Sequence, residues 1–258
     1  MESSADGFET VRPDDYLLRL AATDEAQAYK KLAIAELGIQ GGDTVLDLGC
    51  GPGADLPGMA AAVGDAGCVI GMDIDAAALA MAAGRAHGLT QVILSRCDAH
   101  QLGVADAVVD RAYADRIGQH LADPLGVLCE VKRVLQPGGT AVFAEPDWDT
   151  LVIDYPDLAM ARAYARFVAD RVVRNGCIGR QLPALASRAG LVVRKIIPMT
   201  SVSRDATAAD KILGLQRVTE RAASAGYFTP EQARKWLGHL AKGPFFASLT
   251  LFVVVTTN

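Results

Sequence analysis

A glycine-rich turn that directly follows a short apolar segment constrains the fold of this chain more than any other feature. Residues 45–53 read VLDLGCGPG, in which the first four residues have the composition of a buried strand and Gly49, Gly51 and Gly53 alternate with other residues. Glycine in such a turn lets backbone N–H groups approach a ligand, because no Cβ stands in the way. In a parallel sheet this turn lies at the carboxyl end of a strand, where ligands bind. The segment therefore predicts an α/β fold with a ligand site at that edge.

Strand-like and helix-like segments alternate through the first 145 residues, which is the pattern of βαβ units. The five strands expected there are 44–48, 68–72, 91–95, 109–114 and 140–144. Two more β-rich segments follow, at 191–197 and 245–255, separated by helical sequence. We therefore expect a Rossmann-like three-layer α/β/α sandwich, with a seven-stranded, mostly parallel sheet, an antiparallel last strand and inserted lid helices.

Charge and apolar content exclude several classes of protein. The chain has 25 Lys and Arg against 30 Asp and Glu, a net charge of -5, which argues against binding nucleic acid through its phosphates. The longest strongly apolar run, 245–255, is shorter than the roughly 20 residues that span a bilayer. Acidic residues occupy the N-terminal segment, where a secretory signal would carry basic ones. We expect a small-molecule partner, no nucleic acid, no membrane and a cytoplasmic location.

The cysteines and histidines do not have the spacing of a metal site. The five cysteines lie far apart and never form a CxxC pair, and the four histidines are equally scattered. We expect free thiols and no bound metal.

A second acidic position lies at the end of the next predicted strand. Residues 69–75 read VIGMDID, and Asp73 ends the apolar run, where a carboxylate can accept hydrogen bonds from two ribose hydroxyls. Asp75 is better placed as a helix N-cap. The glycine turn also satisfies a loose dinucleotide-binding pattern, so a nicotinamide or flavin enzyme stays an alternative. Asp47 at the strand end favours a ligand with a cationic end over a pyrophosphate.

Together these segments resemble the class I S-adenosylmethionine-dependent methyltransferases, in particular the small-molecule branch similar to the ubiquinone, menaquinone and natural-product enzymes. VLDLGCGPG resembles the first motif of that family and GMDID the second. Three further segments carry the resemblance, namely SRCDAH at 95–100, ADRIGQHLADP at 114–124 and LQPGGT at 135–140. The resemblance covers about residues 30–147, with the motifs in the order of the family.

The resemblance implies S-adenosylmethionine as cofactor, S-adenosylhomocysteine as product, and a set of cofactor contacts. Those around the methionine part are Asp47 and the backbone of Gly49, Cys50, Gly51 and Gly53. Those of the nucleoside are Asp73 on the ribose, Ile74 packed on the adenine, Asp98 on its amino group, and Cys97 and Ala99 beside the ring. Ala114 and Arg116 belong to the segment after the fourth strand, and Arg116 is a candidate partner for a carboxylate of the cofactor or the substrate.

Candidates for catalysis and for the substrate pocket follow from position. His120 is the first candidate base, because imidazole titrates near neutrality, and Glu145 and Asp147 at the end of the fifth strand are the others. Tyr16 and Trp148 are candidate substrate-pocket residues. We expect no specific role for His100. The base is optional, because alignment of the reactants alone lowers the barrier by roughly 7–11 kcal/mol.

We expect a single domain with a monomeric or homodimeric state. Its parts are N-terminal helices in 1–40, a cofactor-binding core in 41–147, helical substrate-pocket insertions in 148–190 and 200–243, and the last strands in 191–199 and 245–256.

The expected reaction is transfer of a methyl group by direct displacement to a small molecule, in the biosynthesis of a specialised metabolite. Three alternatives remain: a macromolecular acceptor, a non-methylating reaction such as decarboxylation, hydroxylation or cyclisation that uses the same cofactor, and an NAD-dependent oxidoreductase.

Overall fold

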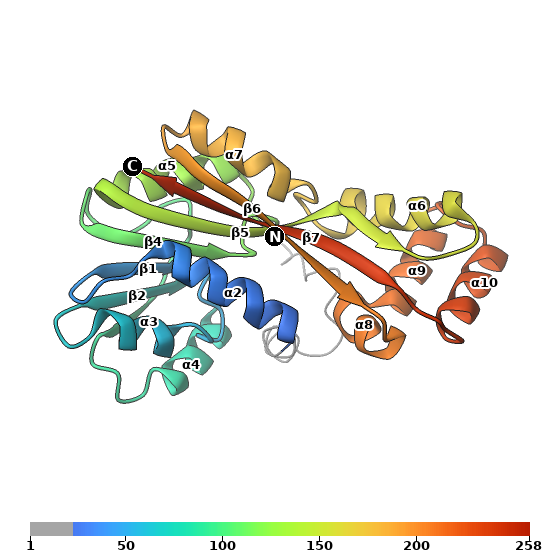
Figure 1. Cartoon of the computed structure of the whole chain (residues 1–258), viewed down its shortest axis with the longest axis horizontal. Helices are drawn as coiled ribbons and strands as arrows, with labels where there is room; N and C mark the ends of the chain where they lie inside the picture. Colours follow the sequence, from blue (N-terminus) through green and yellow to red (C-terminus); the bar gives the residue numbers. More distant parts are fainter. Residues whose placement is uncertain (1–22) are drawn as a thin grey trace.

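The computed structural model describes residues 23–258, which form one seven-stranded sheet in the order β3-β2-β1-β4-β5-β7-β6 (Figure 1). The strands are β1 Thr44–Leu48, β2 Cys68–Asp73, β3 Val92–Arg96, β4 Val109–Asp115, β5 Leu135–Ile153, β6 Val192–Ser203 and β7 Ala247–Thr257. Neighbours from β3 to β5 are parallel, and β7 runs antiparallel to both β5 and β6. The predicted mostly parallel sheet with a reversed last strand is confirmed.

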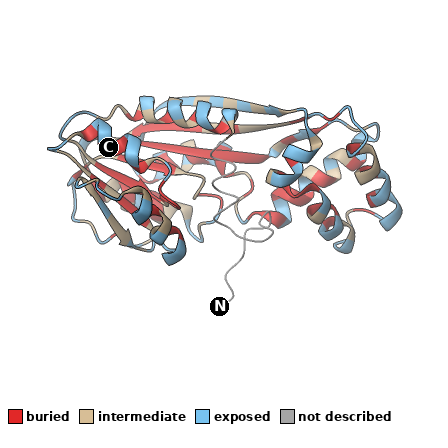
Figure 2. Ribbon diagram, turned by 90° about the horizontal axis from the view of Figure 1, so that it is seen from below, coloured by how far each residue is buried: buried red, intermediate tan, exposed pale blue. Residues whose placement is uncertain are grey.

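Helices cover both faces of the sheet, because successive strand residues point to opposite sides. Val45 packs in the core with helices α2, α3 and α4, while Leu46 packs in the core with α5 and α7. Figure 2 shows the buried strands lying between helices with exposed outer faces. These helices are α2 Asp24–Leu37, α3 Leu56–Val63, α4 Ala76–Arg85, α5 Pro124–Val134 and α7 Ile178–Arg188. The three-layer arrangement expected from the sequence is therefore confirmed.

The remaining helices form a lobe at the far end of the long strands β5, β6 and β7 (Figure 1). The lobe helices are α6 Leu158–Phe167, the π-helical turn η1 Val168–Val172, α8 Ala206–Leu213, α9 Leu215–Ser224 and α10 Pro230–Leu240. They share their own apolar core, in which Trp236 and Tyr164 are fully buried with ring centroids 5.2 Å apart. This core continues onto the ends of β5 and β7 through Trp148 and Ala247.

Strand β5 is much longer than the five residues that the sequence indicated. It continues through Asp147 to Ile153, where pairing with β7 resumes after a register shift at 147–152. Trp148, Leu151 and Ile153 are buried along this extension. Residues 148–153 were expected at the start of a helical insertion. They continue the strand instead, because their backbone pairs with β7, a distant segment that the local sequence pattern does not indicate. The extension carries the lobe over the carboxyl edge of the sheet.

No helix among residues 23–258 is long and apolar enough to cross a membrane.

Candidate active site

The glycine turn after β1 has the backbone shape that the sequence predicted. Gly49 has φ +72°, in the left-handed region, and its N–H donates to the carbonyl of Met72 at 2.7 Å. A Cβ on Gly49 would lie 2.1 Å from Cγ2 of Ile117, which excludes any other residue without movement of that loop. Gly49 and Gly51 consequently expose backbone to the space beyond the strand ends.

A cavity of about 1680 Å³ opens at this edge and extends beneath the lobe. It brings together many of the residues predicted from the sequence. Those lining it are Gly49, Gly51, Asp73, Ile74, Cys97, Asp98, Ala99, Arg116, His120 and Trp148. The other predicted residues within the described chain do not line it, namely Asp47, Cys50, Gly53, Ala114, Glu145 and Asp147. Tyr16 lies outside the described residues.

Asp47 does not line the cavity. It is 3% exposed, and burial raises the pKa of its carboxyl well above the usual range. Asp115, which ends the neighbouring strand β4, does line the cavity. Asp47 lies one residue before the end of β1 and is packed in the interior.

Asp73 holds the glycine turn and the following helix in place. Its Oδ2 accepts from the N–H of Gly51 at 2.8 Å, and its Oδ1 accepts from the N–H of Asp75 at 2.9 Å. Asp75 in turn caps α4, with Oδ1 accepting from Ala77 N–H at 2.8 Å. Asp73 therefore lines the cavity with a fixed orientation, whereas the carboxylate of Asp75 serves the helix.

An apolar surface and a carboxylate lie side by side on the next part of the cavity wall. Ile74 is 62% exposed, unusual for so large an apolar side chain. Asp98 Oδ1 accepts from the backbone N–H of His100 at 2.9 Å and lies 2.7 Å from its Nδ1, and these hydrogen bonds lower the pKa of Asp98. His100 Nε2 accepts from Asp123 N–H at 3.2 Å. The ring of His100 therefore links Asp98 to the start of α5.

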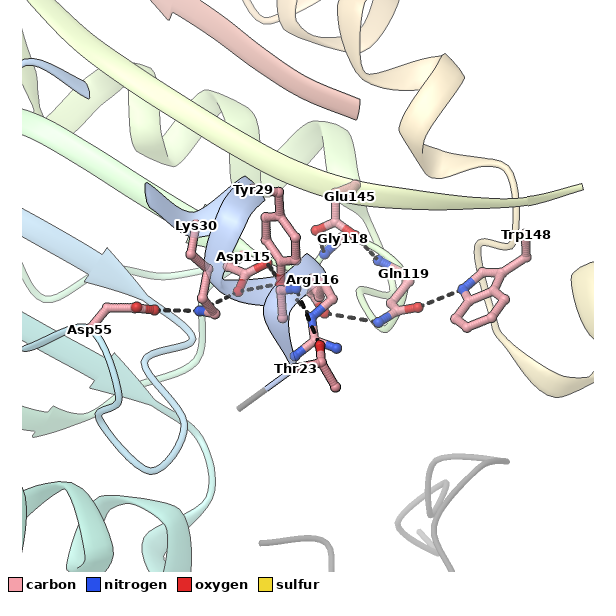
Figure 3. Close-up of polar contacts among 11 residues, drawn as sticks. Thr23, Tyr29, Lys30, Asp55, Asp115, Arg116, Gly118, Gln119, Glu145 and Trp148 are labelled. Atoms are coloured by element: carbon pink, nitrogen blue, oxygen red, sulfur yellow. Dashed lines mark hydrogen bonds and ion pairs between the residues drawn. The ribbon is translucent and has the colours of Figure 1, made fainter. Parts of the chain in front are cut away.

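Helix α2 contributes a buried ionic cluster that the sequence reasoning missed (Figure 3). Lys30 Nζ lies 2.5 Å from Asp55 and 2.6 Å from Asp115, and Tyr29 donates to Asp115 at 3.1 Å. Burial disfavours the charged Lys30, but the two carboxylates outweigh it and raise its pKa. Tyr29 and Asp115 line the cavity. The only local signal was the position of Asp115 at the end of a predicted strand.

The loop after β4 is held against β5 by Glu145 (Figure 3). Gly118 N–H donates to Glu145 Oε1 at 2.5 Å and Gln119 N–H donates to Oε2 at 3.3 Å. A Cβ on Gly118 would lie 2.9 Å from that same Oε1, which explains a glycine at this position. Glu145 is thus a buried anchor of the loop rather than a base facing the cavity. Burial raises its pKa to about 8, against the opposing effect of the bond from Gly118.

This raised pKa predicts a pH dependence of stability that Glu145→Gln removes. Between about pH 4.5 and 8 the folded chain keeps a proton that the unfolded chain has released, so unfolding becomes easier as pH rises. We expect the free energy of unfolding of the wild type to fall relative to Glu145→Gln by about 1 kcal/mol per pH unit in this interval. Urea titrations from pH 5 to 8 measure it. Glu231→Gln, on the exposed surface of α10, should run parallel to the wild type, and parallel curves for both variants would contradict the assignment.

Asp147, the third candidate base, is also engaged elsewhere. Its side chain is fully buried and forms an ion pair with Arg180, with Oδ1 accepting from a guanidinium nitrogen at 2.9 Å. The pair ties β5 to α7. Of the three candidate bases, only His120 lines the cavity.

His120 and Trp148 lie on two segments that hydrogen bonds connect. The indole N–H of Trp148 donates to Gln119 Oε1 at 2.8 Å, and the amide of Gln119 donates to the carbonyl of Arg116 at 3.2 Å (Figure 3). Trp148 is 5% exposed but contributes to the cavity wall. The loop that carries His120 is therefore fixed to the first residue of the β5 extension.

Residues 39–190 match the model of a family described as a methyltransferase domain. The chain is 52% identical over 250 residues to an uncharacterised 37.1 kDa protein in transposon Tn4556 of Streptomyces fradiae, covering 96% of this chain and 72% of that protein. It is 28% identical over 139 residues to demethylmenaquinone methyltransferase of Staphylococcus aureus, covering 54% of this chain and 58% of that enzyme.

A solved structure shares the fold. A SAM-dependent methyltransferase from Aquifex aeolicus superposes with a TM-score of 0.53 and 22% identity, covering 73% of this chain and 93% of that one. Among residues 23–258, no three His, Cys, Asp or Glu side chains gather as they would around a metal ion.

Proposed function

This chain belongs to the methyltransferase domain family and is a class I S-adenosylmethionine-dependent methyltransferase, and we propose that its acceptor is a small, largely apolar molecule of specialised metabolism. The nicotinamide or flavin enzyme that the loose glycine pattern left open does not fit this family. The single observation that carries the acceptor proposal is the cavity beneath the lobe. Its far end, which we call the acceptor half, is lined mainly by apolar residues, including Trp148, Leu151, Ile212, Leu213 and Leu249.

The near end of the cavity, which we call the cofactor half, suits S-adenosylmethionine. Gly49, where a Cβ would clash with Ile117, and Gly51, whose φ is +52°, offer backbone to the cavity. Asp73 lies at the end of β2, and Ile74 offers an exposed apolar surface to a planar base. The carboxylates of Asp73 and Asp115 also line this half of the cavity, and Asp115 is paired with Lys30. We propose these residues, with Asp98, as the cofactor contacts.

The size of the cavity supports a second ligand beside the cofactor. Ligand pockets commonly measure about 300–1,000 Å³, and this cavity exceeds that range. The Staphylococcus aureus relative is named for demethylmenaquinone, which has an apolar body. A similarly apolar acceptor would fit against the apolar lining of the acceptor half. A macromolecular acceptor is disfavoured, because the net charge is -5.

In the proposed reaction the chain mainly excludes water, aligns the acceptor and takes up a proton. Bound S-adenosylmethionine supplies an electrophilic methyl group on a sulfonium. The acceptor atom forms a bond to that methyl as the sulfur–methyl bond breaks, and S-adenosylhomocysteine is released. His120 lines the cavity, and we propose that its imidazole accepts the proton that the acceptor loses. Trp148, held by Gln119, provides a fixed apolar wall for alignment.

The test is methyl transfer with the cofactor labelled on its methyl group. The purified chain is incubated with this cofactor and panels of apolar phenols, amines and carbon acids, and label in the organic extract is compared with S-adenosylhomocysteine formed. Equal amounts of both are expected for one panel class. Label recovered only in protein or RNA would contradict a small acceptor, and acceptor conversion with the label retained on the cofactor would indicate the non-methylating alternative.

Replacement of His120 by alanine should slow turnover without weakening cofactor binding. We expect kcat to fall by about tenfold, less than the usual effect of a general base, because alignment supplies most of the acceleration. Calorimetry with S-adenosylhomocysteine should give the same Kd within about twofold, since the role we propose for His120 is toward the acceptor and not the cofactor. His87→Ala, at an exposed position outside the cavity, is the matched control. Unchanged kcat for His120→Ala would remove it from the mechanism.

A further inference from the structure

Charged side chains line both halves of the cavity. In the cofactor half, Arg96 and Arg116 accompany the carboxylates of Asp73, Asp75, Asp98 and Asp115, whereas the basic residues of the acceptor half are Arg174 and Arg204. The acceptor half also contains Asp205, but its Oδ1 accepts from the N–H groups of Thr207 and Ala208 at 2.8 and 3.1 Å, so this carboxylate caps α8. The acceptor half therefore presents two guanidinium groups beside apolar side chains.

Neither arginine has an ion-pair partner within the described chain. Both residues are exposed, and among residues 23–258 no side chain forms an ion pair or hydrogen bond with Arg174 or Arg204. Arg180, by contrast, is paired with Asp147 and Asp149, and Arg133 with Glu130 and Asp106. Both arginines of the acceptor half are thus available to a ligand.

The backbone at Arg174 is fixed relative to His120. The side-chain amide of the next residue, Asn175, donates to the carbonyls of Gly118 and Leu121 at 2.8 Å each, and its backbone N–H donates to Gln119 at 3.0 Å. The carbonyl of Gly176 accepts from Trp148 N–H at 2.7 Å. Arg174 therefore projects from a segment tied to both sides of the proposed reaction centre, and little backbone order remains to be gained when a ligand binds.

We propose that Arg174 and Arg204 bind an anionic group on the acceptor, which is an otherwise apolar molecule carrying a carboxylate or another acidic group. This inference rests on the proposed function and names the acceptor class. A neutral apolar ligand would displace water from the guanidinium groups without forming hydrogen bonds to them, which costs free energy. An anionic group would instead accept charged hydrogen bonds from the guanidinium groups. Such bonds are stronger beside apolar side chains, because the local dielectric constant is lower there. Trp148 and Leu213 supply walls of that kind.

A matched pair of fluorescent probes tests the proposal without knowledge of the natural acceptor. Anilinonaphthalene sulfonate is an apolar anion, and phenylnaphthylamine has the same skeleton without the sulfonate. Both are titrated into the full chain saturated with S-adenosylhomocysteine. We expect the anion to bind about tenfold more tightly, the effect of one or two charged hydrogen bonds. In the Arg174→Gln/Arg204→Gln variant that preference should vanish, with affinity for the neutral probe unchanged within about twofold.

The control is Arg166→Gln, which removes an exposed arginine of α6 outside the cavity and should leave both affinities as in the wild type. Equal affinities of the two probes in the wild type, absence of binding by the anion, or an unchanged preference in the double variant would overturn the proposal. Calorimetry with S-adenosylhomocysteine alone distinguishes failure of the proposed function from failure of the proposed acceptor class. Failure of that ligand to bind contradicts the proposed function, whereas normal binding with no anion preference contradicts only the acceptor class.

Discussion

Replacing Asp73 by alanine is expected to weaken binding of S-adenosylhomocysteine by about a hundredfold, because two hydrogen bonds from ribose hydroxyls to a carboxylate contribute about 1.5 kcal/mol each at the low end of their range. The structure adds a second reason. Asp73 Oδ2 also holds the N–H of Gly51 at 2.8 Å, so its loss frees the turn that presents backbone to the cofactor. Calorimetric Kd values for wild type and variant measure the effect.

Asp75 provides a matched control two residues away. It lines the same cavity, but its Oδ1 caps α4 through Ala77 N–H. Asp75→Ala should cost about 1 kcal/mol of stability, as loss of a helix cap does, and change the Kd by less than about threefold. Equal cofactor affinity for wild type and Asp73→Ala would discard the ribose assignment, and a large loss of affinity in Asp75→Ala would move it to the neighbouring residue.

The largest loss of folding stability is expected from Lys30→Met. The Lys30 side chain is 13% exposed and bridges Asp55 and Asp115, whose side chains are 20% and 9% exposed. Removing one partner of a buried ion pair leaves its counter-charges without compensation, which typically costs about 3–5 kcal/mol. Asp47, fully buried nearby, also loses the favourable charge of Lys30. Urea denaturation at pH 7 measures the free energy of unfolding.

Lys195→Met tests whether burial of the ion pair causes the large loss of folding stability expected for Lys30→Met. Lys195 is paired with Glu36 at 2.7 Å, but its side chain is 53% exposed, and such surface pairs contribute at most about 1 kcal/mol. The loss of stability in Lys195→Met should therefore be much smaller than that in Lys30→Met. Similar losses in both lysine variants would contradict this account.

Predictions from the sequence were most accurate for features that depend on a few consecutive residues. Gly49 and the strand before it were recognisable because a left-handed turn beside a short apolar run leaves its mark within a few residues. Asp73 was found because it ends the next apolar run, and Asp75 because an N-cap is defined by the residues that follow it. The capping box at the start of α10 is equally local, because Thr229 and Gln232 lie within four consecutive residues.

Predictions about partners far apart in the chain could not be made. The hydrogen bond between Tyr29 and Asp115 joins residues 86 positions apart, and the sequence around neither residue indicates this contact. His120 was the first candidate base and Glu145 and Asp147 were the others, and of the three only His120 lines the cavity. Glu145 turns inward because Gly118 leaves room for its carboxylate, and Asp147 because Arg180 from α7 lies against it.

The amino-acid sequence by itself determined the α/β class, the ligand-binding turn and the family, since these depend on periodicity and on backbone geometry over a few residues. Only the tertiary structure decided which carboxylates face the cavity, how far β5 extends, and where Arg174 lies relative to His120. The physical reason is that the direction of a side chain at a strand end, and its charge state, depend on atoms brought next to it by packing of distant segments.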